Sequence, residues 1–154
     1  MKIIETPNLN NKQKESVFNL WNNEYPANLA YNKLENFDAY LNNLTQQNHY
    51  LIIDNYENIK GWAFVFNREK EKWFAIIISE DFQGKGIGTL LLNKLKENYN
   101  ELNGWVIDHE RDKKSNGKIY KSPIDFYKKN KFEIIYKTRL ELEKISAVKI
   151  NWKE

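Results

Sequence analysis

The sequence predicts one α/β domain over residues 1–154, with a mixed, mostly antiparallel central sheet of about six to seven strands flanked by about four helices on both faces. Three observations support this prediction. The length of 154 residues suits a single domain. Short apolar runs of strand length alternate with longer stretches whose apolar residues recur at helical spacing. Two of the runs, 61–66 and 73–78, are apolar on both faces, as in central strands that helices cover on both sides.

The composition narrows the possible functions. Cysteine is absent, which excludes disulfides, thiolate metal sites and cysteine nucleophiles. The two histidines, His49 and His109, lack the spacing of metal ligands, so we expect no metal. The net charge of +3 is too small to indicate a nucleic-acid-binding face, and no apolar run approaches the ~20 residues of a membrane span. The N-terminal residues lack the apolar core of a signal peptide, so the expected location is cytoplasmic.

The first 45 residues are expected to be mainly helical. Residues 3–4 begin a short edge strand. A helix over 11–24 follows from its amphipathic spacing and ends before Pro26. Asn36 is expected to cap a second helix, whose apolar residues recur at helical spacing as far as Leu44.

A meander of three strands is expected next. The apolar runs 50–53, 61–66 and 73–78 form its strands. A turn at 55–60 separates the first two, and a charged hairpin at 68–72 separates the last two. The chain then forms a helix over about 86–100, which carries a leucine stripe, and a buried strand at 105–107.

A long polar connection and a short helix precede the last two strands. The polar stretch 109–121 is unusually long for a connection in a compact domain, and long ordered loops are often functional. Ser122 and the following proline predict a short helix that runs to about Lys129. The final strands are expected at 132–141 and 147–152.

The segment 76–89 carries the most informative motif. A buried strand leads into a loop with three glycines in five residues, and an amphipathic helix follows. Glycines allow a tight turn with several N–H groups near a ligand, and the free N–H groups of a helix start favour phosphate. The spacing, Q-x-x-G-x-G, fits neither a P-loop nor the dinucleotide fingerprint. The alternative is that the glycines simply mark a turn.

At this segment the sequence resembles the GCN5-related N-acetyltransferase (GNAT) family. The family signature for acetyl-CoA, R/Q-x-x-G-x-G/A, is matched by Gln83, Gly86 and Gly88. The order of expected elements also agrees with that fold. The resemblance implies an N-acyltransferase that passes acetyl from acetyl-CoA to a primary amine of a small molecule or peptide, by direct attack in a ternary complex. The absence of cysteine is consistent with direct transfer.

The resemblance also implies which residues hold the cofactor. In the family, the fourth strand splays from the fifth and its unpaired backbone groups bind the pantetheine arm. Here those groups belong to Ile76 and Ile78, which point the same way because strand residues alternate. Tyr120 stands where many members have asparagine, and Ser122 is expected to replace that contact. The pyrophosphate is expected on the loop residues Gln83, Gly84, Lys85, Gly86, Ile87, Gly88 and Thr89.

A second match to the family lies at 127–132. Members commonly carry Y-x-x-x-G-F, with the tyrosine as general acid near the sulfur of CoA; Tyr127 and Phe132 occupy those places. The alternative for Tyr127 is a packed core aromatic. Lys131 stands where the family has a glycine in a left-handed turn. Either Lys131 is strained or the turn is rebuilt with Asn130 at positive φ.

The base and the acceptor are less defined. His109 is the first candidate for the base, because a histidine accepts protons near neutral pH, and Asp108 and Glu80 are lesser candidates. The alternatives are that His109 is a plain surface residue, that a base acts through water, or that there is no dedicated base. The walls of the acceptor site are expected from 11–47, which contains Trp21, Tyr25, Tyr31 and Tyr40, and from 109–121; those aromatics could equally be core. Two other functions stay open: a non-catalytic CoA-binding or protein-interaction module, and nucleotide binding through the glycine loop.

Overall fold

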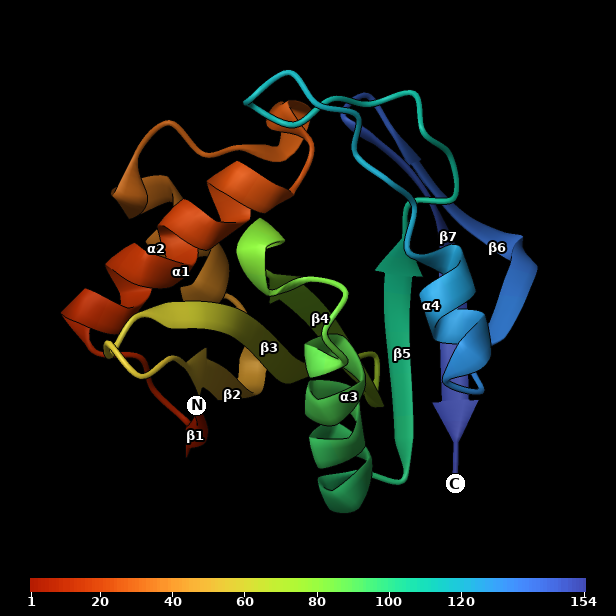
Figure 1. The fold of residues 1–154 in the computed structure, drawn as a ribbon. Helices are drawn as coiled ribbons and strands as arrows, with labels where there is room; N and C mark the ends of the chain where they lie inside the picture. Colours follow the sequence, from red (N-terminus) through yellow and green to blue (C-terminus); the bar gives the residue numbers. More distant parts are fainter.

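The computed structural model describes residues 1–154 and contains one seven-stranded sheet in the order β1-β2-β3-β4-β5-β7-β6 (Figure 1). Neighbouring strands are antiparallel except for β4 and β5, which are parallel. The strands are β1 (Lys2–Thr6), β2 (Thr45–Ile53), β3 (Ile59–Arg68), β4 (Glu71–Ile78), β5 (Glu101–Val106), β6 (Glu133–Leu142) and β7 (Ile145–Lys153). The helices are α1 (Asn11–Glu24), α2 (Leu34–Asn42), α3 (Ile87–Asn98) and α4 (Ile124–Lys129). This architecture confirms the predicted mixed, mostly antiparallel α/β fold.

Two apolar clusters cover the two faces of the sheet. Because side chains alternate along β3, Trp62 and Phe64 pack under α1 and α2, whereas Ala63 and Val65 pack under α3 and α4. All four are buried, at no more than 1% exposure. The prediction that this strand is apolar because helices cover both of its faces is confirmed.

The parallel strands β4 and β5 touch at one point and then separate. The only paired residues are Trp73 and Asn103, whereas β4 pairs with β3 along its whole length, from Glu71 to Ile78. Figure 1 shows β4 leaning away from β5 beyond this point. The carboxyl-terminal half of β4 therefore has one edge that is unpaired, as the sequence resemblance implies.

Several element boundaries differ from the predictions. α2 begins at Leu34 rather than after Asn36, because the Asn36 N–H already donates to the Lys33 carbonyl at 3.1 Å, and α2 ends before Leu44. β2 begins at Thr45, five residues before the predicted start. β5 spans Glu101–Val106 rather than 105–107. The added residues include polar ones that pair through their backbone groups, so no alternation of apolar side chains marks them in the sequence.

The polar stretch 109–121 is anchored to the end of α1. The Ala27 N–H donates to the Lys113 carbonyl at 2.8 Å, and Lys114 Nζ lies 2.9 Å from Glu24 Oε1. The Lys114 and Glu24 side chains are 9% and 10% exposed, so this ion pair is largely withdrawn from solvent. The loop is thereby held beside the gap between β4 and β5. No helix in the structure has both the length and the apolarity to span a membrane.

Candidate active site

A groove of about 440 Å³ opens where β4 separates from β5. Its walls come from β4, the glycine loop, the start of α3, the end of α1 and the region around α4. Eight of the ten residues expected to hold the cofactor line it, namely Ile76, Ile78, Gln83, Gly84, Gly86, Ile87, Gly88 and Thr89. The structure therefore brings together the two halves of the predicted site, the strand edge and the loop.

The backbone groups of Ile76 and Ile78 face this groove. The Ser79 backbone N–H donates to the Lys60 carbonyl at 2.8 Å, so the backbone groups of Ser79 point toward β3. Backbone groups alternate along a strand, and hence those of Ile78 and Ile76 point to the opposite edge, where β5 is absent. One of them already has a partner, because the Gln83 side-chain amide donates to the Ile78 carbonyl at 2.8 Å.

The glycine loop has the backbone conformation that only glycine adopts without strain. Gly84 and Gly86 have φ of +74° and +79°, and a Cβ at either position would meet no atom within 4 Å. Gly86 is also the N-cap residue of α3 and offers no side chain to the free N–H groups of the first turn. These donors, at the positive end of the helix dipole, suit an anion.

The structural reason for glycine at position 88 differs from the reason at Gly84 and Gly86. A Cβ there would lie 3.1 Å from the ring of Phe126, so glycine allows α3 and α4 to approach closely. Lys85 and Ser122 do not line the groove. Lys85 Nζ lies 5.3 Å from the ring centre of Phe82. The Ser122 hydroxyl donates to the Ile107 carbonyl at 2.6 Å, which fixes the approach to α4.

Tyr127 projects from α4 toward the groove. It is 6% exposed, and its ring packs against Phe74 and Phe132 at centroid distances of 5.9 and 5.2 Å. Burial raises the pKa of its phenol well above the usual value, so the phenol keeps its proton at neutral pH. No hydrogen bond within the chain engages this hydroxyl. It is free to donate to a bound molecule.

The turn after α4 resolves the question raised by Lys131. Lys131 has φ +70°, whereas Asn130 has φ −95°. The Phe132 N–H donates to the Tyr127 carbonyl at 3.0 Å, which closes the turn. The lysine therefore occupies the left-handed position itself, and the turn is not rebuilt around Asn130.

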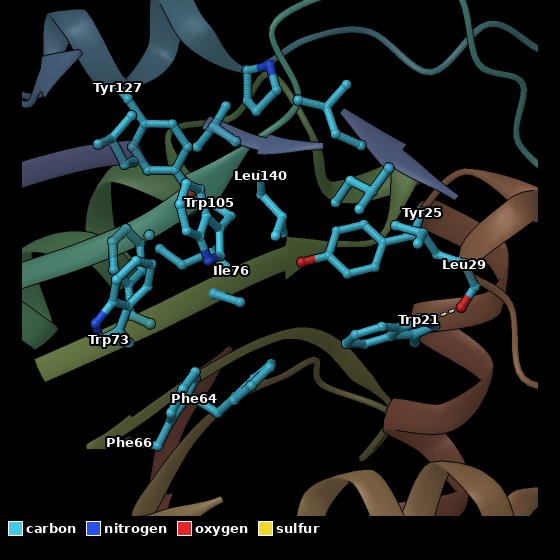
Figure 2. A pocket seen from close by; sticks show the side chains of 18 of the residues that line it. Trp21, Tyr25, Leu29, Phe64, Phe66, Trp73, Ile76, Trp105, Tyr127 and Leu140 are labelled. Atoms are coloured by element: carbon cyan, nitrogen blue, oxygen red, sulfur yellow. Dashed lines mark hydrogen bonds between the residues drawn. The ribbon is translucent and has the colours of Figure 1, made fainter. Parts of the chain in front are cut away.

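An aromatic cavity of about 310 Å³ lies beside the groove (Figure 2). Its walls come from both sides of the gap between β4 and β5 and include Trp21, Tyr25, Tyr31 and Tyr40 from the predicted acceptor region. Figure 2 shows Tyr25 on one side of the cavity and Trp73, Trp105 and Tyr127 on the other. Trp21 is held in place by the hydrogen bond from its indole N–H to the Leu29 carbonyl, at 2.8 Å.

The groove and the cavity meet at a cluster of three tyrosines. Tyr25, Tyr120 and Tyr127 line both spaces, as do Ile76 and Pro123. Burial raises the pKa of Tyr120 to about 12 and the pKa of Tyr25 well above its usual value. All three phenols are therefore protonated donors at neutral pH, gathered where a molecule in the groove would face one in the cavity.

The three candidate bases lie outside both spaces. His109 follows β5, and its Nδ1 accepts a hydrogen bond from the Arg111 N–H at 3.1 Å. Asp108 is paired with Arg139 through two contacts of 2.8 and 3.0 Å, which lower the pKa of its carboxyl.

Glu80 is the third of these candidates, and it is held by lysines. Its carboxylate binds Lys118 Nζ at 2.9 Å, and this bond lowers its pKa. The one carboxylate that does line the groove is Glu24, which is paired with Lys114. The structure therefore brings no unpaired carboxylate to the tyrosine cluster.

Sequence reasoning missed the residues that β3, β4 and β5 contribute to the cavity. Arg68 was expected in a charged hairpin, and Trp73 and Trp105 in buried strands, yet all three line the cavity. The available signal was the position of Arg68 two residues after the all-apolar run 61–66.

Residues 46–134, more than half of the chain, match the family model described as acetyltransferase (GNAT) domain. No curated protein matches the sequence. The structure of an aminoglycoside 6'-N-acetyltransferase complexed with coenzyme A is similar, with TM-score 0.74, 14% identity, and coverage of 99% of this chain and 97% of the other.

Two further solved structures have the same fold. One is the aminoglycoside 6'-N-acetyltransferase from Enterococcus faecium, with TM-score 0.72, 14% identity, and coverage of 99% of this chain and 97% of the other. The other is a phosphinothricin acetyltransferase from Sinorhizobium meliloti in complex with AcCoA, with TM-score 0.68, 12% identity, and coverage of 99% and 89%.

Proposed function

We propose that this chain, which belongs to the acetyltransferase (GNAT) domain family, transfers acetyl from acetyl-CoA to a primary amine of a small molecule or peptide. One observation carries the proposal: the groove along the free edge of β4 meets the aromatic cavity at Tyr127. The two substrates would reach this point from opposite sides, as direct transfer in a ternary complex requires.

The residues of the groove fit acetyl-CoA. The backbone groups of Ile76 and the N–H of Ile78, which face the unpaired edge of β4, would bind the pantetheine arm as an added strand would, whereas the Ile78 carbonyl already accepts from the Gln83 amide. The pyrophosphate would lie on the N–H groups between Gln83 and Thr89, where Gly84 and Gly86 leave open space. When bound, the co-substrate supplies an acetyl thioester that is already activated for attack by an amine.

Tyr127 would serve as the general acid. Its phenol is protonated, free of internal hydrogen bonds and placed where the two spaces meet. A proton given to the departing sulfur stabilises the charge that develops there. Tyr25 and Tyr120 are also donors at this point, and their phenols would orient the reacting groups.

The deprotonation of the amine would be left to water. His109, Asp108 and Glu80 lie outside the groove and the cavity, and the carboxylate of Glu24 is paired with Lys114. A chain of water molecules through the groove, ordered by the tyrosine hydroxyls, is the route that remains for this proton.

Binding and turnover experiments together test this proposal. Isothermal titration calorimetry with acetyl-CoA, CoA and ATP comes first, followed by a panel of primary amines with detection of the released CoA thiol. We expect acetyl-CoA to bind at least tenfold more tightly than ATP and at least one amine to release CoA. Equal affinity for ATP would support nucleotide binding instead. Tight acetyl-CoA binding without turnover of any amine would support a non-catalytic module.

A further inference from the structure

Arg68 is the single charged side chain that lines the aromatic cavity. It lies at the end of β3 and is half-buried. Its guanidinium carbon lies 5.0 Å from the ring centre of Phe66 and 4.9 Å from that of Trp73, so two aromatic rings hold the group in place. The guanidinium is thus positioned by packing rather than by a counter-ion.

No acidic side chain neutralises this arginine. None of the ion pairs of the chain includes Arg68. The lining of the cavity contains no carboxylate either. A guanidinium has five N–H donors in a planar fork that matches a carboxylate, and here they have no acceptor within the protein.

Two further polar groups of the cavity wall lack acceptors. Trp73 lines the cavity, and its buried indole N–H has no hydrogen-bond partner. Tyr40 also lines the cavity, and its phenol, whose pKa burial raises to about 12, makes no hydrogen bond within the chain. Donors without acceptors therefore share the cavity with Arg68.

The chemistry of the lining excludes one class of acceptor. An aminoglycoside or a polyamine carries several positive charges, and here they would meet an unpaired arginine and no carboxylate. Burial of a charge without a partner is strongly unfavourable. A molecule of opposite character, apolar in the middle and negatively charged at one end, would satisfy every group that lines the cavity.

Resting on the proposed function, we propose that the acceptor is a primary amine with an aromatic or aliphatic body and a carboxylate at its far end, which Arg68 binds. The amine would lie at the tyrosine cluster, and the carboxylate would accept the two parallel hydrogen bonds of the guanidinium fork. The apolar body would occupy the aromatic walls between them.

The fold sets the spacing between the two ends of such a molecule. Ile76 lines both the groove and the cavity, and Trp73, against which Arg68 stacks, lies three residues earlier on β4. At about 3.3 Å per residue, these positions are roughly 10 Å apart along the strand. The amine and the carboxylate must therefore be well separated, unlike those of an α-amino acid.

A matched set of amines tests this assignment. Phenylpropylamine and para-(aminopropyl)benzoate differ only in a carboxylate opposite the amine, and phenylalanine carries its carboxylate next to the amine. Their dissociation constants are measured calorimetrically on the protein saturated with CoA and on the protein alone. We expect the benzoate to bind about tenfold or more tightly than phenylpropylamine. Phenylalanine and kanamycin should bind no more tightly than phenylpropylamine.

Variants of Arg68 assign the gain to the guanidinium. Arg68→Gln should abolish the preference for the benzoate, and Arg68→Lys should retain part of it because the charge remains. The control is Arg111→Gln, which removes an exposed arginine outside the cavity and should keep the full preference. Equal binding of the two matched amines by the wild type, no binding of either, or an unchanged preference in Arg68→Gln would overturn the assignment.

The outcome is separable from that of the proposed function. If acetyl-CoA does not bind or no amine is acetylated, the acetyltransferase proposal fails. The ratio of the two dissociation constants on the protein alone still decides whether Arg68 binds a carboxylate. Conversely, rapid acetylation of kanamycin with no turnover of the benzoate would support the acetyltransferase and overturn the acceptor class.

Discussion

The side-chain amide of Asn103 on β5 donates a hydrogen bond to the backbone carbonyl of Lys72 on β4, at 3.1 Å, beside the one residue pair that joins these strands. The side-chain oxygen of Asn103 in turn accepts a hydrogen bond from the side-chain amide of Asn151 on β7, at 2.8 Å. Asn103 is completely buried. One amide therefore ties three strands together at the vertex from which the groove opens.

Replacement of Asn103 by leucine should destabilise the fold and loosen the groove together. The change leaves the Lys72 carbonyl and the Asn151 amide without their partner, which should lower the free energy of unfolding by about 1–3 kcal/mol. Acetyl-CoA should also bind more weakly, because the separation of β4 and β5 is no longer fixed. Urea unfolding and calorimetry measure both effects. Asn100→Leu, at an exposed position, is the control; equal losses in both variants would contradict the role of the vertex.

Gly86→Val should abolish measurable acetyl-CoA binding in a protein that still folds by circular dichroism. Valine at φ +79° is strained by roughly 1–2 kcal/mol, and its side chain would enter the groove. Gly117→Val separates the two effects, because Gly117 has φ +85° and open space around it but does not line the groove. That control should bind acetyl-CoA normally. Unchanged affinity in Gly86→Val would remove the glycine loop from the binding site.

Lys131→Gly should stabilise the protein. Lysine at φ +70° carries roughly 1 kcal/mol of strain that glycine avoids, and the gain is reduced by the greater freedom of glycine in the unfolded chain. The urea midpoint should therefore rise. Lys128→Gly, at an exposed position within α4, is the comparison, and its midpoint should fall because glycine is a poor helix former. A lower midpoint for Lys131→Gly would show that the lysine side chain contributes more than the strain removes.

Local signals explain what the sequence predicts correctly, and long-range packing explains the rest. The glycine turn after Gln83 and the short helix that carries Tyr127 can be found in the sequence because each is marked by a motif of only a few neighbouring residues. Arg68 was not predicted to line the cavity, because its place there depends on Trp73, which the hairpin folds back beside it. The first residues of β2 were missed for a similar reason: their polar side chains hide a backbone pairing.

The buried side chain of His49 should make the protein less stable in mild acid. It is fully buried, and Trp62, whose indole only donates, gives its N–H to His49 Nδ1 at 3.1 Å. Nε2 therefore carries the proton and donates to Gln47 Oε1 at 2.7 Å. Burial lowers the pKa of His49 from 6.5 to about 4. Between pH 6.5 and 4, His49 is protonated in the unfolded chain but not in the folded protein. The stabilisation that comes from its neutral, buried form is therefore complete above pH 6.5 and is lost as the pH falls toward 4.

The expected loss is roughly 3 kcal/mol between pH 6.5 and 4, measured by urea unfolding at a series of pH values. His49→Gln should be less stable at neutral pH but should flatten this part of the profile. His109→Gln, which changes the other histidine, should retain the slope. A wild-type slope in His49→Gln would mean that carboxylates alone account for the acid sensitivity.

Tyr127→Phe should lower kcat and leave the binding of acetyl-CoA unchanged. The substitution removes one oxygen that makes no hydrogen bond within the chain, so the stability should change little. A positioned proton donor contributes about 100- to 10,000-fold in rate, and the loss should fall in that range. Because burial raises the pKa of this phenol, its deprotonation should not limit kcat near neutral pH. Steady-state kinetics and calorimetry on the same preparation measure both quantities.

The neighbouring tyrosines make this prediction specific to one hydroxyl. Tyr25 and Tyr120 line the same junction and also lack hydrogen bonds within the chain. If Tyr127 is the donor to sulfur, Tyr25→Phe and Tyr120→Phe should each reduce kcat less than Tyr127→Phe does. A larger loss in Tyr120→Phe would move the general acid to that residue, which stands where many family members have asparagine. If chemistry is rate-limiting and all three variants keep the wild-type kcat, the proton must reach sulfur from water.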